Sequence, residues 1–181
     1  MMNTFLAGGV VLGLAAAPAF AGQQPTTAEK ADQTMAYGKM SDEAFVKKAA
    51  SAGREEVELG KLAVEKASSD EVKKFGQRMV DDHSKAGDEL KILAQNKHIT
   101  LPAETEARGT ATYDRLSKLS GASFDRAYMQ TMAAGHRQAL SDFRMETKMG
   151  SDADVKGWAA KTLPTIEEHI KMVQGAGSKK P

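Results

Sequence analysis

The sequence contains no cysteine. This absence excludes disulfide bonds, thiolate metal sites, thiol catalysis and lipidation at a signal-cleavage site. Aromatic residues make up only 6% of the chain, which argues against a base-stacking platform and against a carbohydrate-binding groove. Neither sign of charge dominates, because Lys+Arg number 25 and Asp+Glu number 24, and the charges are interspersed. The basic footprint of a nucleic-acid binder is therefore missing, and we expect no nucleic-acid partner.

Strand signals are also missing, and no second apolar segment approaches membrane length after the N-terminal region. Apolar residues recur instead with the period of an amphipathic helix, about 3.6 residues. The sequence therefore predicts an all-α protein without a transmembrane segment in the mature chain. Without disulfides, such a chain must be held together by core packing.

Residues 1–21 resemble an export signal. The apolar run from Phe5 to Ala17 is too short to span a bilayer comfortably, and residues 19–21 form an A-x-A cleavage site. Because the segment before the run has no Lys or Arg, an uncleaved membrane anchor is the alternative. Glycines and a proline in and after the run favour a cleaved signal, so we expect a periplasmic or otherwise exported protein.

The rest of the chain divides into three parts. Residues 22–40 are polar and aperiodic, and we interpret them as a flexible linker. Residues 41–175 are predicted to form one helical bundle domain, and residues 176–181 a disordered tail.

Four long amphipathic helices are predicted within this domain, beginning at Ser41, Glu71, Ser123 and Asp152. The connection over residues 97–122 is unusually long for neighbouring bundle helices and suits a crossover, as in ferritin-like folds. A short helix is expected within it, and Pro102 could start a helix there. The predicted fold is therefore an all-α, ferritin-like antiparallel four-helix bundle with a short extra helix in the connection. We expect one core that contains Phe45, Leu59, Phe75, Leu90, Phe124, Phe143, Trp158 and Ile166.

Four residues that bind metals well are predicted to point into the middle of this bundle: Glu56, His83, His136 and His169. With a rise of about 1.5 Å per residue, they fall within about one helical turn of each other along the bundle. Imidazole nitrogens and one carboxylate suit Zn, Fe, Mn or Cu. The neighbouring methionines would favour copper if they were ligands, but methionine is also an ordinary core filler. The sequence therefore predicts one transition-metal ion on these four residues.

The alternative for this cluster is a metal-free polar core. In that arrangement Glu56 bonds one histidine, and the others bond Tyr128, Thr131 or water. The fourth histidine, His98, lies past the end of its helix and is expected to be exposed.

Four segments of the chain resemble motifs of one family. They are EVELGKLA from Glu56, FGQRMVDDH ending at His83, FDRAYM from Phe124 followed by His136, and LPTIEEH ending at His169. Together they resemble the exported bacterial Domain of Unknown Function 4142 family over about residues 41–174. The resemblance implies a ferritin-like bundle in the cell envelope and assigns no activity.

The chain departs from the di-iron enzymes that share this fold class. Those enzymes carry Glu-x-x-His on two helices, whereas Val80, Ala133 and Ile166 stand three residues before the histidines here. Oxygen-activating chemistry therefore does not follow from the fold. Two functions remain, and whether either is enzymatic stays open. One is an envelope metal-binding protein. The other is a non-catalytic bundle that serves a structural or stress-related role or binds an envelope protein partner.

Overall fold

The computed structural model describes residues 40–103, 105 and 107–178, so the expected signal peptide and nearly all of the linker lie outside the described residues. The described part is all-α, as predicted, with five helices and no strand. The helices are α2 (Asp42–Lys66), α3 (Asp70–Asn96), α4 (Ala107–Ser117), α5 (Gly121–Met149) and α6 (Ala153–Ser178). None of the described helices is both long and apolar enough to cross a membrane.

Local signals fix two of the helix ends. Ser41 caps α2, and its side chain accepts a hydrogen bond from the Ala44 backbone N–H at 3.1 Å. Gly150 is the C-cap of α5, as its position after the last apolar residue of the helix predicts. The helix in the long connection begins at Ala107 rather than at Pro102, which lies in a non-helical segment. Pro102, which could have started that helix, instead has its carbonyl in a hydrogen bond with Arg54 of α2 at 2.8 Å.

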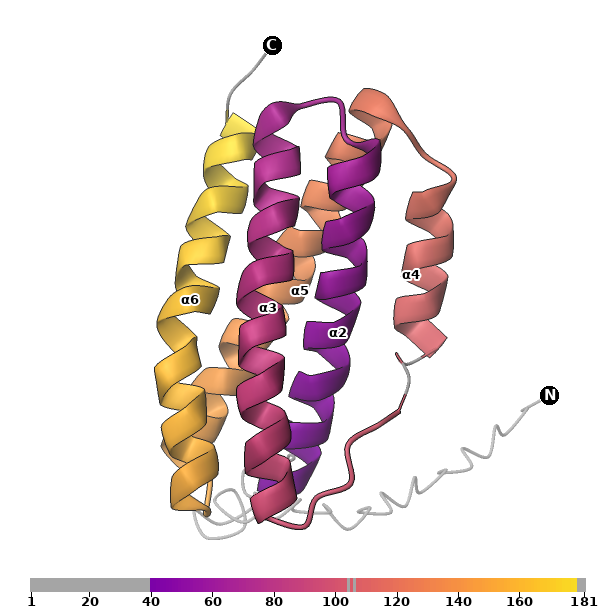
Figure 1. The fold of residues 1–181 in the computed structure, drawn as a ribbon. Coiled ribbons are helices and arrows are strands. Elements are labelled where there is room, and N and C mark those ends of the chain that lie inside the picture. The colour runs from indigo at the N-terminus through magenta and orange to yellow at the C-terminus, as the bar shows by residue number, and fades with distance from the viewer. Residues whose placement is uncertain (1–39, 104, 106, 179–181) are drawn as a thin grey trace, which may run out of the picture. The chain divides into compact units, whose positions relative to one another are not determined.

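The four long helices pack as two hairpins (Figure 1). At the start of α5, Asp125 accepts a hydrogen bond from the Ser69 backbone N–H in the α2–α3 turn at 3.0 Å. At the start of α2, Asp42 accepts one from the Asp152 backbone N–H in the α5–α6 turn at 2.7 Å. These contacts place each turn beside the first residues of the other hairpin. Helices are therefore antiparallel within each hairpin, whereas α3 and α5 run in the same direction (Figure 1).

The segment between α3 and α5 makes this parallel arrangement geometrically feasible. It travels the length of the bundle outside α2, and α4 lies against α2 on that side (Figure 1). Leu116 of α4 is fully buried and joins the core near the α2–α3 turn. The short extra helix is thus a packed part of the domain.

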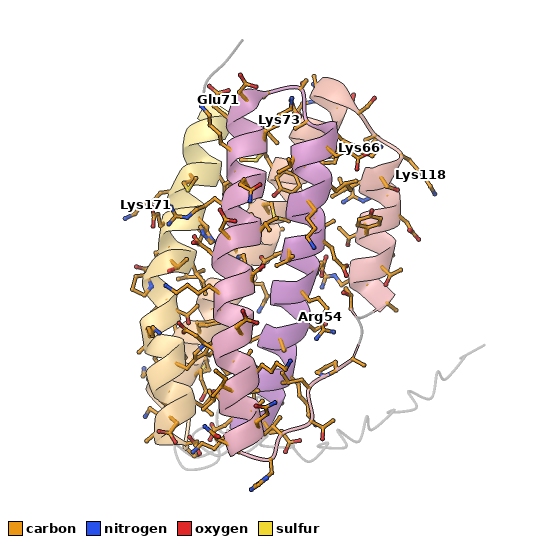
Figure 2. The ribbon with its side chains drawn as sticks, in the orientation of Figure 1. Arg54, Lys66, Glu71, Lys73, Lys118 and Lys171 are labelled. Carbon is orange, nitrogen blue, oxygen red and sulfur yellow. The ribbon has the colours of Figure 1, made fainter. Side chains whose placement is uncertain are left out.

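The apolar interior consists of two clusters rather than the single core that we predicted. Leu59, Phe75 and Phe124 belong to the cluster toward the α2–α3 turn. The other contains Phe45, Leu90, Phe143 and Ile166, and the partly buried Trp158 packs against it. The separation follows from the polar residues Glu56, His83, His136 and His169, which occupy the helix faces between the two clusters. Charged side chains lie on the outside, as Figure 2 shows for Lys66, Glu71, Lys73, Lys118 and Lys171.

Helices α2 and α3 approach each other closely at a pair of glycines, between these polar residues and the α2–α3 turn. A Cβ atom on Gly60 would lie 2.7 Å from the Gly76 carbonyl oxygen, and one on Gly76 would lie 2.9 Å from the Gly60 carbonyl oxygen. No side chain fits between the helices at this level. The backbone contact therefore fixes the register of α2 against α3, and with it the level at which Glu56 meets His83.

Candidate metal centre

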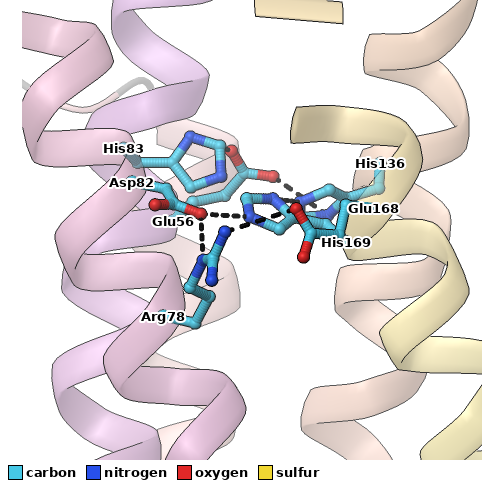
Figure 3. A network of polar contacts seen from close by, with 7 residues as sticks. All are labelled: Glu56, Arg78, Asp82, His83, His136, Glu168 and His169. Carbon is cyan, nitrogen blue, oxygen red and sulfur yellow. Dashed lines mark hydrogen bonds and ion pairs between the residues drawn. The ribbon is translucent and has the colours of Figure 1, made fainter. Parts of the chain in front are cut away.

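Each of the four long helices contributes to one buried polar cluster (Figure 3). Glu56 comes from α2, His83 from α3, His136 from α5 and His169 from α6. His136 and His169 are completely buried, and Glu56 is 8% exposed. The structure thus brings together all four residues that the sequence predicts for the site. The exposed His98 lies elsewhere, as expected.

Glu56 bridges two of the histidines with its two carboxylate oxygens. Its Oε2 atom lies 3.3 Å from Nδ1 of His83, and its Oε1 atom lies 3.4 Å from Nδ1 of His136. The Nδ1 atom of His136 also lies 2.9 Å from the Met132 carbonyl oxygen, one turn earlier on α5. Both Nδ1 atoms therefore face oxygen atoms that accept hydrogen bonds.

His169 is held between a histidine and a carboxylate. Its Nδ1 atom lies 3.1 Å from Nε2 of His136, and its Nε2 atom lies 2.8 Å from Oδ2 of Asp82. Asp82 is in turn bonded by Nε of Arg78 on the same helix, and Arg78 reaches Glu168 of α6 at 3.3 Å (Figure 3). The chain of contacts runs from the buried histidines out to a surface ion-pair network.

The pKa values of this outer pair agree with a neutral His169 facing an ionised Asp82. Burial lowers the pKa of His169 to about 4, although the hydrogen bond with Asp82 opposes the shift. Burial by itself raises the pKa of Asp82, but hydrogen bonds from Arg78 and His169 outweigh it and lower that pKa below its usual value. At neutral pH the Asp82 carboxylate is therefore an acceptor, and His169 has a single N–H to give.

These contacts determine where the protons of neutral rings must lie. A neutral imidazole carries one N–H and one bare nitrogen. His83 and His136 place Nδ1 against Glu56 or a carbonyl, and His169 places Nε2 against Asp82, so these three nitrogens are the donors. The bare nitrogens are then Nε2 of His83, Nε2 of His136 and Nδ1 of His169.

The bare nitrogens lack partners that suit them. Nε2 of His83 is buried and has no hydrogen-bond partner among the described residues. Nε2 of His136 and Nδ1 of His169 face each other at 3.1 Å, and two lone pairs at that distance repel unless a proton or a cation lies between them. One ligand nitrogen from each of the three histidines can be chosen so that all lie within 4.8 Å of one another. The cluster therefore has the donor set of a three-histidine metal site.

The hydrogen-bond partners predicted for a metal-free core do not take that role. The Tyr128 hydroxyl is buried without a hydrogen-bond partner among the described residues. The Thr131 hydroxyl donates to the Ala127 carbonyl and accepts from Arg115. Neither hydroxyl forms a hydrogen bond with one of the histidines.

The methionines near the histidines are explained by packing. Met79 and Met132 are buried in the apolar cluster that also holds Phe75, and Met172 packs against that cluster. Core filling accounts for their positions.

Sequence reasoning missed Asp82 and Arg78. Asp82 precedes His83 and lies at the edge of the apolar face of α3, where an acidic residue is normally solvated. The available signal was its spacing from Arg78, since residues four apart on a helix pair readily. Its contact with His169 on another helix depends on how α3 and α6 pack, and no local pattern carries that information.

Comparisons with known proteins identify a family for this chain and a solved structure with a similar fold. A family model described as a domain of unknown function (DUF4142) matches residues 24–175. The crystal structure of a Streptomyces coelicolor protein, described as secreted and as DUF305, has a TM-score of 0.63 with 14% identity. The similarity covers 74% of this chain and 88% of that one. No curated protein matches the chain.

Proposed function

We propose that this chain, which belongs to the DUF4142 family of domains of unknown function, binds one transition-metal ion through His83, His136 and His169. One observation carries the proposal. One ring nitrogen from each of three histidines, on three helices, can be chosen so that all three lie within 4.8 Å of one another, and each ring has its other contacts with an oxygen acceptor.

The donor set fits the geometry of a metal site. In a tetrahedral site with metal–nitrogen bonds of about 2.0–2.1 Å, the ligand nitrogens lie about 3.4 Å apart. The 3.1 Å separation of the His136 and His169 nitrogens is close to that value. His83 supplies the third nitrogen, which lies within 4.8 Å of the ligand nitrogens of the other two histidines.

Three neutral imidazoles select among metals. Imidazole suits Zn, Cu and Fe, whereas Mn favours carboxylate and water ligands. Glu56 and Asp82 then act as acceptors that orient the rings and set their tautomers, as outer carboxylates do in many metal sites. Glu56 also contacts two histidines, at 3.3 and 3.4 Å, so a role as a further ligand, which its sequence position suggests, is open to it.

The competing function is a metal-free polar core. Three contacts follow one another: the Met132 carbonyl with His136, His136 with His169, and His169 with Asp82. As hydrogen bonds they need three protons, and two neutral imidazole rings carry only two. A metal-free core therefore requires an additional proton between His136 and His169. That proton makes one ring an imidazolium in a fully buried position. Burial disfavours a charged His169, which is why the metal is the better occupant.

We also propose that the domain is ferritin-like and acts outside the cytoplasm, in the periplasm or an equivalent exported compartment. Four long helices, the lengthwise connection and the parallel α3 and α5 support the fold. The export-like residues 1–21 and the description of the Streptomyces coelicolor protein as secreted support the location. Metal storage or delivery in the envelope is the role that these features favour.

Metal titration of the chelator-treated, untagged protein tests the site. Zn, Cu, Mn and Fe(II) are added separately while the melting temperature is followed. A ligand that binds only the folded state at 100 times its dissociation constant stabilises it by about 2.7 kcal/mol. We expect Zn or Cu to raise the melting temperature, with one metal bound per chain by elemental analysis.

Two variants make the test specific. His83→Ala removes a proposed ligand and should abolish the metal-induced shift. His98→Asn alters an exposed histidine outside the site, where asparagine tolerates the positive φ of 56°, and should retain the shift. A wild-type melting temperature that no metal changes would show that the cluster is a structural polar core.

A further inference from the structure

A cavity of about 320 Å³ opens on the side of the histidines away from the α2–α3 turn. Its lining comes from α2, α3, α5 and α6 and includes Leu90, Phe143, Trp158 and Ile166. At its inner end it reaches Glu56, His83 and His136. Cavities of this size, mostly apolar with a few polar groups, are typical of sites for small molecules.

Small residues lie along this cavity. Gly53 and Gly87 both line it, one on α2 and one on α3. A Cβ atom on Gly87 would have no atom within 4 Å, and one on Gly53 would meet only Nδ1 of His83 at 3.9 Å. Glycine weakens a helix relative to alanine, and here no close packing requires it. This contrasts with Gly60 and Gly76, where the backbones touch.

Two unsatisfied donors belong to residues that line the same cavity. Nη1 of Arg54 and Nε1 of Trp158 are buried and have no hydrogen-bond partner among the described residues. Arg54 is anchored through Nη2 to the Pro102 carbonyl and forms no ion pair with a described carboxylate. Figure 2 shows its side chain on the flank of α2, beside the connection to α4. A partly buried guanidinium without a carboxylate needs an acceptor of opposite charge.

The other charges at the cavity do not supply that acceptor. Asp88 and Lys91 also line it, are both exposed and offset each other in charge. Glu56 is already engaged by His83 and His136. A ligand for this cavity would therefore need a carboxylate to pair with Arg54 and an apolar part to contact the apolar side chains that line the cavity.

We propose that this cavity binds a small aliphatic monocarboxylate, with its carboxylate on Arg54 and its chain against Leu90 and Phe143. Arginine is suited to this role because its planar fork matches the two oxygens of a carboxylate. The site is adjacent to the three-histidine cluster and does not depend on it. Binding is expected in the metal-free protein, so failure of the metal proposal leaves this one intact.

The single tryptophan provides the readout, because Trp158 lines the cavity. Chelator-treated protein is titrated with hexanoate and, as a neutral probe of similar size, with 1-hexanol. The fluorescence of Trp158 should change and then saturate as either ligand is added. Saturation should occur at a lower concentration of hexanoate than of 1-hexanol. Arg54→Gln should weaken hexanoate by about tenfold and leave 1-hexanol unchanged, since a charge-assisted hydrogen bond is lost.

A second variant covers the case in which Arg54→Gln fails to fold. Gly87→Leu adds a large side chain at a residue that lines the cavity and should weaken both probes. Gly175→Leu is the matched control on α6, where a Cβ atom also has no neighbour within 4 Å, and should bind as wild type does. Three results would overturn the proposal: no saturable response to hexanoate in wild type, equal affinity in Arg54→Gln, or hexanoate binding only after metal is added.

Discussion

Nε2 of His136 and Nδ1 of His169 face each other at 3.1 Å, while the other nitrogen of each ring faces an oxygen atom. The outward-facing nitrogen of each ring therefore has a hydrogen-bond acceptor. The two nitrogens that face each other have no N–H left to share if both rings are neutral. With Nδ1 of His136 and Nε2 of His169 as the donors, a proton or a metal ion is needed between the facing nitrogens. The two occupants have different consequences for affinity and for pH dependence.

The first prediction concerns Asp82 as an orienting residue for His169. Asp82→Ala removes the acceptor of Nε2, so the ring can adopt the tautomer that protonates Nδ1. Metal affinity should fall by roughly 10–100-fold, the range found when outer partners of metal ligands are removed. Isothermal titration with Zn measures it. Asp81→Ala is the control, because it makes the same charge change at the adjacent exposed position of α3. Equal loss in both variants would point to a general charge effect.

The second prediction concerns the stability of the metal-free protein in acid. The pKa of His169 is about 4 in the folded state, against an ordinary value of about 6.5 in the unfolded chain. Between these values the unfolded state binds more protons, so stability should fall as the pH drops from about 6.5 to about 4, by roughly 3 kcal/mol. Urea unfolding at several pH values measures this.

Asp82 contributes in a separate, lower window. Its pKa is lowered in the folded state, so its contribution is present above the ordinary carboxyl pKa and is lost as the pH falls further. His169→Gln should abolish the loss of stability between pH 6.5 and about pH 4, whereas the Asp82 contribution should persist through its hydrogen bond from Arg78. A wild-type stability that is constant between pH 7 and pH 4.5 would contradict a buried, neutral His169.

The third prediction separates two kinds of glycine on the α2–α3 seam. Gly60→Ala places a methyl group 2.7 Å from the Gly76 carbonyl oxygen and should cost about 1–3 kcal/mol of stability. Gly87→Ala meets no neighbour and should stabilise by up to about 1 kcal/mol through helix propensity. Thermal unfolding of the two variants measures whether each substitution lowers or raises the stability. A stabilised Gly60→Ala would mean that the helices separate easily at that level.

The fourth prediction concerns Phe75, which is 2% exposed and packs its ring 6.4 Å from that of His136 and 6.3 Å from that of His169. Phe75→Ala should cost on the order of 3–5 kcal/mol, because it leaves a cavity beside the polar cluster. Ile92→Ala, at a side chain that is 60% exposed, should stay within about 0.5 kcal/mol of wild type. A loss below about 1 kcal/mol for Phe75→Ala would mean that the surrounding side chains collapse into the space.

The fifth prediction concerns export. Cleavage after Ala21 should leave a soluble product that begins at Gly22, because residues 19–21 form an A-x-A motif after a short apolar run. Intact-mass measurement of protein from a periplasmic extract tests this. A mass that includes residues 1–21, or recovery from membranes alone, would support an uncleaved anchor.

The helices and the site residues could be predicted because they depend on local periodicity. The apolar positions of α3 repeat regularly around His83, so the inward direction of that side chain follows from spacing. Mid-helix levels are insensitive to helix direction, which is why Glu56 and the three histidines could be placed together before the topology was known.

Features that depend on packing between helices could not be predicted. The contact of Asp82 with His169 depends on how α3 is rotated about its axis relative to α6. The division of the core into two clusters depends on how much space the polar residues occupy between them. The cavity is a further case, because the close contact at Gly60 and the open space at Gly87 involve the same residue type in the same pair of helices. Sequence spacing does not distinguish them.

The two hairpins also suggest an order of assembly. Contacts within each hairpin join segments close in sequence, and such contacts form early, whereas closing the long connection comes later. Glu56, Asp82 and His83 belong to one hairpin, and His136 and His169 belong to the other. Neither hairpin alone carries three histidines, so a metal ion would bind tightly only after the hairpins have docked. Such an ion would slow their separation and convert a reversible encounter of two halves into a long-lived fold.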